Sequence, residues 1–298
     1  MVYRVLILCS LLLAAGPAAA ATIYKYTDAN GVVSYTDVPV YGARVFKVRE
    51  RMVERIEQQV RLLPKKTAAG VTLMARNDLY GPAEIELRLE GFANVRGQPP
   101  SSIRRVIPAR STVNLLTLLA DNPGKPLRYK SKFRSSFGDP DVQVAGYRYP
   151  LPWVGGPFRL SQGPNGKYSH FGAKGRYAMD IAMPEGTQII AARAGTVVKV
   201  ENRQSGRGDN ASGNFVRVLH DDGTMSVYLH LMRGSVSVRE GQKVVVGTPL
   251  ARSGNTGNST GPHLHFVVQR NAGLGLESIP YQFDRPVGTL PNFAVGGQ

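Results

Sequence analysis

Short runs of alternating apolar and polar residues recur along most of the chain and predict a mainly β protein. In the C-terminal half these runs lie at residues 188–192, 195–200, 215–219, 225–229, 243–246 and 263–269, with turn residues between them. No convincing helical period interrupts them. We therefore predict an antiparallel β domain over residues 150–298.

A second group of strand-like runs occupies residues 68–149. Residues 83–90 alternate strictly and place three aliphatic side chains on one face. Turns that contain proline or glycine separate this run from others at 71–74, 102–107, 112–119 and 127–133. This spacing predicts a small β-sandwich. The sandwich contains no cluster of titratable residues, which favours a structural or substrate-positioning role.

The first 21 residues have the pattern of a secretory signal peptide. Arg4 precedes an apolar run from Val5 to Leu13, and small residues follow as far as Ala21. The run is too short to span a bilayer, and no later segment is apolar enough to do so. We expect an exported protein of the periplasm or cell envelope, without a transmembrane segment after signal cleavage. An uncleaved anchor is the alternative.

Two further elements are predicted between the signal and the sandwich. Alternating runs at 23–27 and 32–36 flank a turn that ends in glycine, so residues 22–48 are predicted to form a β-hairpin domain. Residues 49–66 are predicted to form a short helix, because apolar residues recur three to four positions apart at Val53, Ile56, Val60 and Leu63. We interpret this helix as a solvated linker. A basic face turned toward an anionic polymer is the alternative.

Composition and charge narrow the class of partner. The chain has 37 Lys and Arg against 21 Asp and Glu, a formal net charge of +16. For an exported protein, this charge points to anionic envelope polymers or lipid head groups. We discount nucleic acid, because the basic residues are dispersed and no nucleic-acid motif is present. The one cysteine, Cys9, lies in the signal, so disulfides and cysteine–zinc sites are excluded from the mature chain.

Candidate chemistry gathers in the C-terminal half, which contains all five histidines. His263 and His265 share one strand face about 7 Å apart, which suits one metal ligand and one imidazole beside it. Two incidental surface histidines are the alternative. Asp180 lies in an apolar run and needs a partner there, either a metal, an arginine or a turn cap. His230 is predicted to share a strand face with Tyr228, and a lone histidine at such a position is more often an ordinary residue satisfied by a hydrogen bond.

Several of these motifs, in this order, resemble the lysostaphin-like zinc metallopeptidases of the M23 family. The matching residues are His170, Asp180, the segment 228–231 and the loop and strand 254–265, with turns at 184–187, 191–195 and 240–247. The resemblance covers about residues 150–272. It implies a C-terminal domain of lysostaphin-like fold that cuts peptide crosslinks between peptidoglycan stems. Residues 22–48 resemble a small N-terminal domain of unassigned function found on envelope proteins of proteobacteria.

The resemblance also implies the roles of five residues. His170, Asp180 and His265 look like the ligands of one Zn²⁺ ion, and His230 and His263 look like the unliganded catalytic histidines. Many relatives hold the first histidine and the aspartate four residues apart, whereas ten separate them here, and residues 171–176 read as an inserted loop. Two imidazoles and one carboxylate leave tetrahedral zinc one open position, where water can be activated near neutral pH. We expect His230 and His263 jointly to orient or deprotonate that water and to stabilise the oxyanion.

A non-catalytic cell-wall-binding or hydrolase-activator protein of the same fold is the main alternative. Relatives of that kind have lost zinc ligands, whereas all five site positions here keep a competent residue. A structural zinc would ordinarily take four protein ligands. The loop 254–261 lacks the lysine of a phosphate-binding loop and is expected to form one wall of the substrate groove. His220 is expected to be a hairpin-turn residue, and residues 22–149 to place or restrict the site rather than complete it.

Overall fold

The structure, a computed structural model, describes residues 23–27, 33–36, 41–42, 44–46, 59–206 and 211–289. The chain divides into two compact units, Met1–Arg51 and Met52–Gln298. In the first unit, β1 (Ile23–Thr27) pairs antiparallel with β2 (Val33–Thr36) and with β3 (Arg44–Phe46). The hairpin predicted there is confirmed. The predicted signal peptide, residues 1–21, lies outside the described residues.

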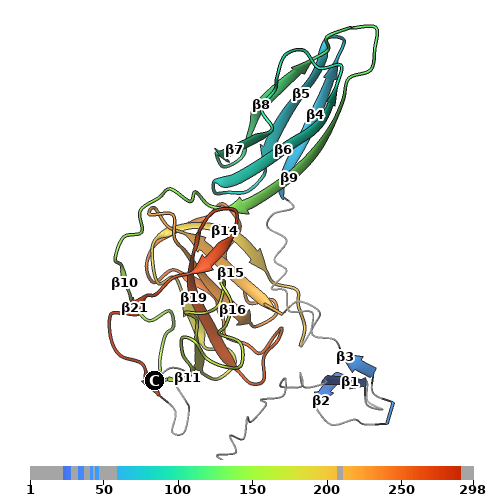
Figure 1. Cartoon of the computed structure of the whole chain (residues 1–298). Helices are drawn as coiled ribbons and strands as arrows, with labels where there is room; N and C mark the ends of the chain where they lie inside the picture. The colour runs from blue at the N-terminus through green and yellow to red at the C-terminus, as the bar shows by residue number, and fades with distance from the viewer. Residues whose placement is uncertain are drawn as a thin grey trace, which may run out of the picture. The chain divides into compact units, whose positions relative to one another are not determined.

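The second unit begins with a β-sandwich of two three-stranded antiparallel sheets (Figure 1). One sheet has the order β4-β5-β8 and the other the order β7-β6-β9. The inner faces meet through aliphatic side chains from both sheets, including Leu73, Leu87, Leu89 and Leu118. The small sandwich predicted from the alternating pattern is therefore present. Its strands are β4 (Val60–Thr67), β5 (Gly70–Asn77), β6 (Ala83–Ala93), β7 (Ser102–Ile107), β8 (Ser111–Leu119) and β9 (Arg128–Phe137).

The helix predicted for residues 49–66 is wrong over residues 60–66, which belong to strand β4. This strand pairs with β5 along its whole length, from Val60 opposite Asn77 to Thr67 opposite Gly70. Pro64 would break a helix interior, but it is tolerated here because β4 lies at the edge of its sheet. Pairing with β5 thus overrides the local helical period. Residues 49–58 lie outside the described residues.

A nine-stranded sheet forms the frame of the C-terminal part, as the alternating runs predict. Its order is β17-β14-β15-β16-β19-β12-β11-β22, with β20 paired to β19, and all pairs except β11–β22 are antiparallel. The strands are β11 (Arg159–Gln162), β12 (Met179–Ala182), β14 (Gly195–Glu201), β15 (Asn214–Leu219), β16 (Met225–Leu231), β17 (Lys243–Val244), β19 (His263–Asn271), β20 (Leu276–Ser278) and β22 (Gly288–Thr289). Smaller pairs are formed by β13 (Gln188–Ile190) with β18 (Pro249–Arg252) and by β10 (Arg148–Tyr149) with β21 (Gln282–Phe283).

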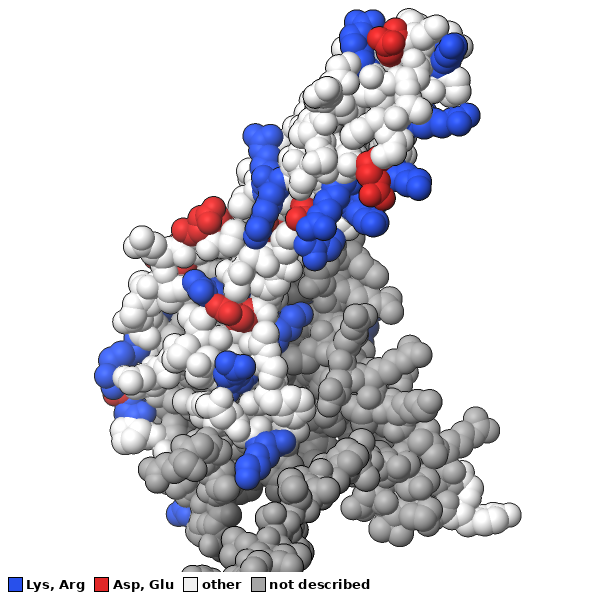
Figure 2. Space-filling model, in the orientation of Figure 1, with Lys and Arg blue, Asp and Glu red and all other residues white. Residues whose placement is uncertain are grey.

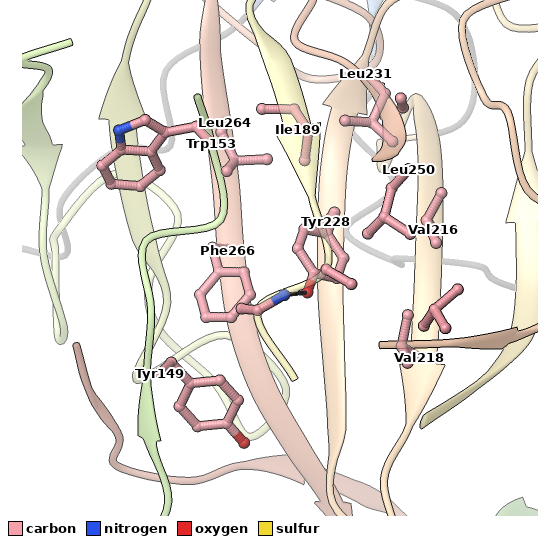
Figure 3. Packing of buried hydrophobic residues seen from close by; sticks show 14 of the residues in the cluster. Tyr149, Trp153, Ile189, Val216, Val218, Tyr228, Leu231, Leu250, Leu264 and Phe266 are labelled. Carbon is pink, nitrogen blue, oxygen red and sulfur yellow. Dashed lines mark hydrogen bonds between the residues drawn. The ribbon is translucent and has the colours of Figure 1, made fainter. Parts of the chain in front are cut away.

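One face of the large sheet packs against the short strand pairs and their connections (Figure 3). Tyr228 and Phe266 lie at the centre of this core, with their ring centroids 5.2 Å apart. The hydroxyl of Tyr228 accepts a hydrogen bond from the backbone N–H of Ala192 at 2.9 Å. A buried hydroxyl with a satisfied hydrogen bond fits the prediction that Tyr228 packs rather than reacts.

The opposite face of the large sheet shares a core with the sandwich. Ile85 and Phe137 of the sandwich belong to the same buried cluster as Val227 and Val267 of the large sheet. Polar contacts reinforce this junction, because Glu84 accepts hydrogen bonds from the Asn271 side chain at 2.8 Å and the Leu274 backbone at 2.6 Å. The sandwich and the large sheet are therefore joined by continuous packing. In the part of the chain that the structure describes, no helix has the length and apolar character needed to cross a membrane.

Candidate metal centre

Three side chains from two strands and one loop converge on the sheet face that points away from Tyr228. Asp180 on β12 lies directly opposite His265 on β19, so both side chains project from the same face. His170 comes from the loop between β11 and β12 and is fully buried. The structure thus brings together three residues that are separated by up to 95 positions in the sequence.

The ligand atoms of these residues are spaced as a single metal ion requires. His265 Nδ1 lies 2.8 Å from Asp180 Oδ1, and His170 Nε2 lies 3.1 Å from the same oxygen. The candidate ligand atoms of all three residues lie within 4.8 Å of one another. Two ligands of a tetrahedral zinc, each bound at about 2.0–2.1 Å, are separated by roughly 3.3 Å. The three residues can therefore hold one ion with little rearrangement.

The hydrogen bonds of His170 leave its inner nitrogen free to bind a cation. Its Nδ1 lies 2.8 Å from the backbone carbonyl of Gly163, and a carbonyl oxygen can only accept, so Nδ1 carries the proton. The lone pair of Nε2 then faces Asp180, and among the described residues this buried atom has no hydrogen-bond partner. A lone pair and a carboxylate oxygen at this distance repel unless a positive charge lies between them. The donor set of two imidazoles and one carboxylate fits zinc.

Electrostatics also favour a charged carboxylate at the centre. Burial alone would raise the pKa of Asp180, but His265 and His170 together hold that pKa well below 3.8. Burial lowers the pKa of His265, while Asp180 opposes that shift. An ionised carboxylate and neutral imidazoles are the protonation states that bind a metal.

Gln162, which sequence reasoning missed, orients the carboxylate of Asp180 through a hydrogen bond. It lies opposite Asp180 in the β11–β12 pair, and its Nε2 donates to Asp180 Oδ2 at 2.8 Å. Its Oε1 accepts the backbone N–H groups of Tyr168 and Ser169, which lead into His170. One side chain therefore orients Asp180 and anchors the loop that supplies His170. In the sequence it is only a polar residue at the end of a short alternating run.

His230 reaches the centre through a β-bulge. Tyr228 pairs with Val216 and Leu231 with Asn214, so Leu229 and His230 together oppose only one residue of β15. His230 has φ of 62°, a left-handed conformation that costs about 1–2 kcal/mol for a residue other than glycine. The prediction that His230 shares a face with Tyr228 is therefore wrong. The extra residue turns the imidazole to the opposite face, with its ring centroid 4.7 Å from that of His263.

The loop that precedes β19 orients both remaining histidines. His230 Nδ1 donates to the carbonyl of Thr256 at 2.8 Å, and His263 Nδ1 donates to the carbonyl of Gly261 at 2.8 Å. Nδ1 of each ring is thereby fixed as the donor, so Nε2 is the accepting nitrogen of the neutral ring, and that of His263 lies 3.6 Å from Asp180 Oδ1. Burial lowers the pKa of His230 to about 3, so this ring is neutral at pH 7. Two hydrogen-bond acceptors thus stand beside the candidate ligands.

His220 is more than the turn residue that we predicted. It is buried, and it joins the turn between β15 and β16 to the neighbouring strands. Its Nδ1 donates to the carbonyl of Ala194 at 2.8 Å, and its Nε2 lies 3.1 Å from Ser226 Oγ. Burial lowers the pKa of His220 to about 4. Because Ser226 is itself fully buried, this pair stabilises the core and does not meet solvent.

Fold and site together define a β protein with a candidate mononuclear metal centre, and two segments of the chain match known families. Residues 174–274 match Peptidase family M23, and residues 9–73 match DUF4124, a domain of unknown function. The chain therefore carries an M23 peptidase domain preceded by a DUF4124 domain.

Several proteins are similar to the C-terminal part. Peptidoglycan DD-endopeptidase ShyA of Vibrio cholerae is 40% identical over 89 residues, which are 30% of this chain and 19% of ShyA. Murein hydrolase activator NlpD of Salmonella dublin is 35% identical over 102 residues, 34% of this chain and 25% of NlpD. The solved catalytic domain of the M23 protein EnpA from Enterococcus faecalis is 26% identical, with coverage of 43% of this chain and 92% of that domain and a TM-score of 0.35. The chain thus spans a quarter or less of these two curated relatives.

Proposed function

We propose that this protein is a zinc-dependent endopeptidase that hydrolyses peptide crosslinks of peptidoglycan in the cell envelope. The observation that carries the proposal is the convergence of three buried candidate ligands, His170, Asp180 and His265, beside two imidazoles whose Nδ1 atoms are held by backbone carbonyls. Three protein ligands leave a tetrahedral ion one open position, as in catalytic rather than structural sites. A zinc ion bound there supplies a Lewis acid for the amide carbonyl and lowers the pKa of its water to about 7.

The two unliganded histidines handle the proton in this proposal. His263 Nε2 takes the proton of the attacking water, because this nitrogen lies 3.6 Å from Asp180 Oδ1 and the side chain is 13% exposed to solvent. His230 Nε2 accepts a second hydrogen bond from the water and so fixes its direction of attack, since burial keeps this ring neutral. The carbonyls of Thr256 and Gly261 hold both tautomers in place.

The substrate bond is proposed on similarity. ShyA is named a peptidoglycan DD-endopeptidase, and the N-terminal domain resembles one from proteobacterial envelope proteins. Both favour a D-alanyl–diaminopimelate crosslink over a glycine bridge. Such a substrate requires export to the periplasm, which the signal-like pattern of residues 1–21 supports.

A hydrolase activator without catalysis is the second candidate, and the similarity to NlpD favours it. An activator needs no metal and no proton acceptor. The ligand set and both further imidazoles are complete here, and the strained backbone of His230 is maintained. The left-handed backbone at His230 lowers the stability of the fold. A catalytic role of the imidazole explains why this conformation is kept, so we rank the enzyme first.

Digestion of purified sacculi tests the proposal. The unsubstituted chain is expected to release soluble muropeptides, and mass analysis identifies the bond that is cut. A chelator should abolish release and added zinc should restore it. His263→Ala should retain zinc, because His263 is not a ligand, yet release nothing. Absence of fragments from the zinc-loaded, folded, unsubstituted chain would leave the activator as the remaining candidate.

A further inference from the structure

The sandwich has a large excess of basic over acidic residues. Residues 60–138 contain fourteen Lys or Arg and five Asp or Glu, a formal net charge of +9. Figure 2 shows basic side chains along the sandwich. A charge of one sign at this density attracts an anionic partner.

The outward face of sheet β7-β6-β9 gathers six of these cations. We call it the cationic face and define it by Arg88, Arg104, Arg128, Lys130, Lys132 and Arg134, which the burial pattern places at the surface. The strand register sets Arg88 directly opposite Lys132, two like charges side by side. Like charges in that position destabilise a sheet. Glu86 and Glu90 offset part of this repulsion, and an anionic ligand would offset more of it.

The acids of the same face do not balance its charge. Glu84 and Glu86 lie beneath the arginines, with side chains 2% and 11% exposed. Glu84 pairs with Arg104, and Glu86 pairs with both Arg88 and Arg134. Arg134 and Arg88 hold the pKa of Glu86 below its ordinary value, so this acid stays ionised. Glu90 is the third acid of this face; it is 61% exposed and lies 3.9 Å from the ammonium group of Lys132. Six cations against three acids leave the face with a net positive charge.

The shape of the face favours an extended polymer. β6 has eleven residues and so spans roughly 33 Å. None of the large apolar side chains that are exposed in the described residues belongs to the cationic face. A membrane-binding surface ordinarily adds apolar anchors to its charge. Charges on edge strands also prevent aggregation, but either sign serves that purpose.

We propose that the cationic face is a second binding surface for peptidoglycan, separate from the metal centre, and that it binds the free carboxylates of stem peptides along a strand. The choice of this polymer rests on the proposed function. The face begins beside Glu84, where the sandwich joins the core of the large sheet. A peptidoglycan strand bound to this face would therefore be attached to the same packed unit that contains the metal centre.

Sedimentation with purified sacculi tests this surface without hydrolysis. Every chain carries His263→Ala, so the polymer stays intact whether or not the protein is an enzyme. Lys130→Gln with Lys132→Gln removes two charges from the cationic face. Lys65→Gln with Lys66→Gln is the matched control, because these exposed lysines lie on β4 of the other sheet. All four lysines are exposed, and thermal unfolding checks that each variant folds.

Substitution of Lys130 and Lys132 is expected to weaken binding to sacculi at low salt by roughly 25-fold, since each basic side chain near an anionic surface contributes about fivefold. The control pair is expected to weaken it by less than about threefold. Equal losses in both pairs, or no loss in either, would overturn the assignment of the face. Binding to anionic phospholipid vesicles that depends on the same two lysines, without binding to sacculi, would replace the polymer by a membrane.

The two proposals fail separately. The unsubstituted chain is expected to cleave a soluble crosslinked muropeptide. With His263 intact, the Lys130 and Lys132 variant is expected to digest sacculi more slowly than the unsubstituted chain does. If no chain cleaves the muropeptide, the enzyme is wrong while the sedimentation result stands. If sacculi are digested equally fast by both chains, the cationic face is wrong while the enzyme stands.

Discussion

The metal centre and the cationic face use charged residues in opposite ways. At the centre, Asp180 is buried and held by Gln162, while backbone carbonyls fix the rings of His170 and His230. On the sandwich, Lys130 and Lys132 stand in solvent, with no such constraint. Buried ionic groups are costly to leave without partners, whereas exposed ones contribute little to stability. We therefore expect single substitutions to matter at the centre and only combined charge changes to matter on the face.

The largest effect is expected from Asp180→Asn. The amide cannot supply the negative charge that the ion and both imidazoles face, so zinc affinity should fall by more than about 100-fold and hydrolysis should be lost. Competition with a chromophoric zinc chelator measures the affinity. Asp221→Asn is the matched control, because its carboxylate is 90% exposed and lies outside the site. Unchanged zinc affinity in the Asp180 variant would show that Asp180 is not a ligand and that the proposed centre is wrong.

The next effect separates catalysis from metal binding at His230. His230→Asn keeps a residue that tolerates a left-handed backbone but removes the imidazole. We expect zinc content to remain and the turnover number to fall by about 10²–10⁴-fold. His230→Val should in addition lower the melting temperature, because a β-branched residue opposes φ of 62°. Full turnover in the asparagine variant would assign His230 a purely structural role.

A smaller effect is expected behind the ligands at Gln162. Gln162→Ala removes the donor to Asp180 and the anchor of the loop before His170. Residues in this position ordinarily contribute 10–100-fold to metal affinity or activity. The same chelator competition measures the loss, with Gln188→Ala as the control, since Gln188 is exposed on β13. Equal affinities in the two variants would show that β11 only supports the fold.

The smallest effect on chemistry, and a clear one on stability, is expected at the junction. Glu84→Ala leaves Arg104, Asn271 and the Leu274 N–H without their acceptor. We expect the free energy of unfolding to fall by about 2–3 kcal/mol at pH 7. Urea unfolding measures this loss, and Glu90→Ala, whose side chain is 61% exposed, should lose less than about 1 kcal/mol. Similar losses in both variants would mean that the junction is not held by Glu84.

The pH dependence of the junction follows from the same residue. Burial would raise the pKa of Glu84, but the Leu274 N–H, Arg104 and Asn271 lower it below 4.5. A group with a depressed pKa in the folded state stabilises the protein above its unfolded value and loses that contribution as pH falls through the folded value. The difference in stability between the unsubstituted chain and Glu84→Ala should therefore be constant above about pH 5 and shrink below about pH 4.5.

Much of the frame follows from local pattern, whereas the finer geometry depends on pairing at a distance. The alternation around Ile85 and around His263–Val268 predicts strands that the structure contains. The bulge at His230 has no such local signal, because it arises from the register of β15 against β16. Gln162 gains its role only when β11 pairs with β12. In the same way, the residues near Val60 have a helical period in the sequence but form a strand, because they pair with β5.

The core shared by the sandwich and the large sheet also could not be predicted from local sequence patterns. Phe137 and Val267 are 130 positions apart, and each reads as an ordinary inward residue of its own sheet. Their shared burial limits how independent the two parts can be. The expectation that residues 22–149 only place or restrict the site stays a prediction, since it depends on how the C-terminal part folds alone.

Anomalous diffraction at the zinc absorption edge, from crystals of the zinc-loaded chain, tests the central claim most directly. We predict one strong peak at about 2.0–2.2 Å from His170 Nε2, an Asp180 carboxylate oxygen and His265 Nδ1, with no fourth protein ligand. No peak at these atoms, or a peak closed by a fourth side chain, would contradict a catalytic zinc centre.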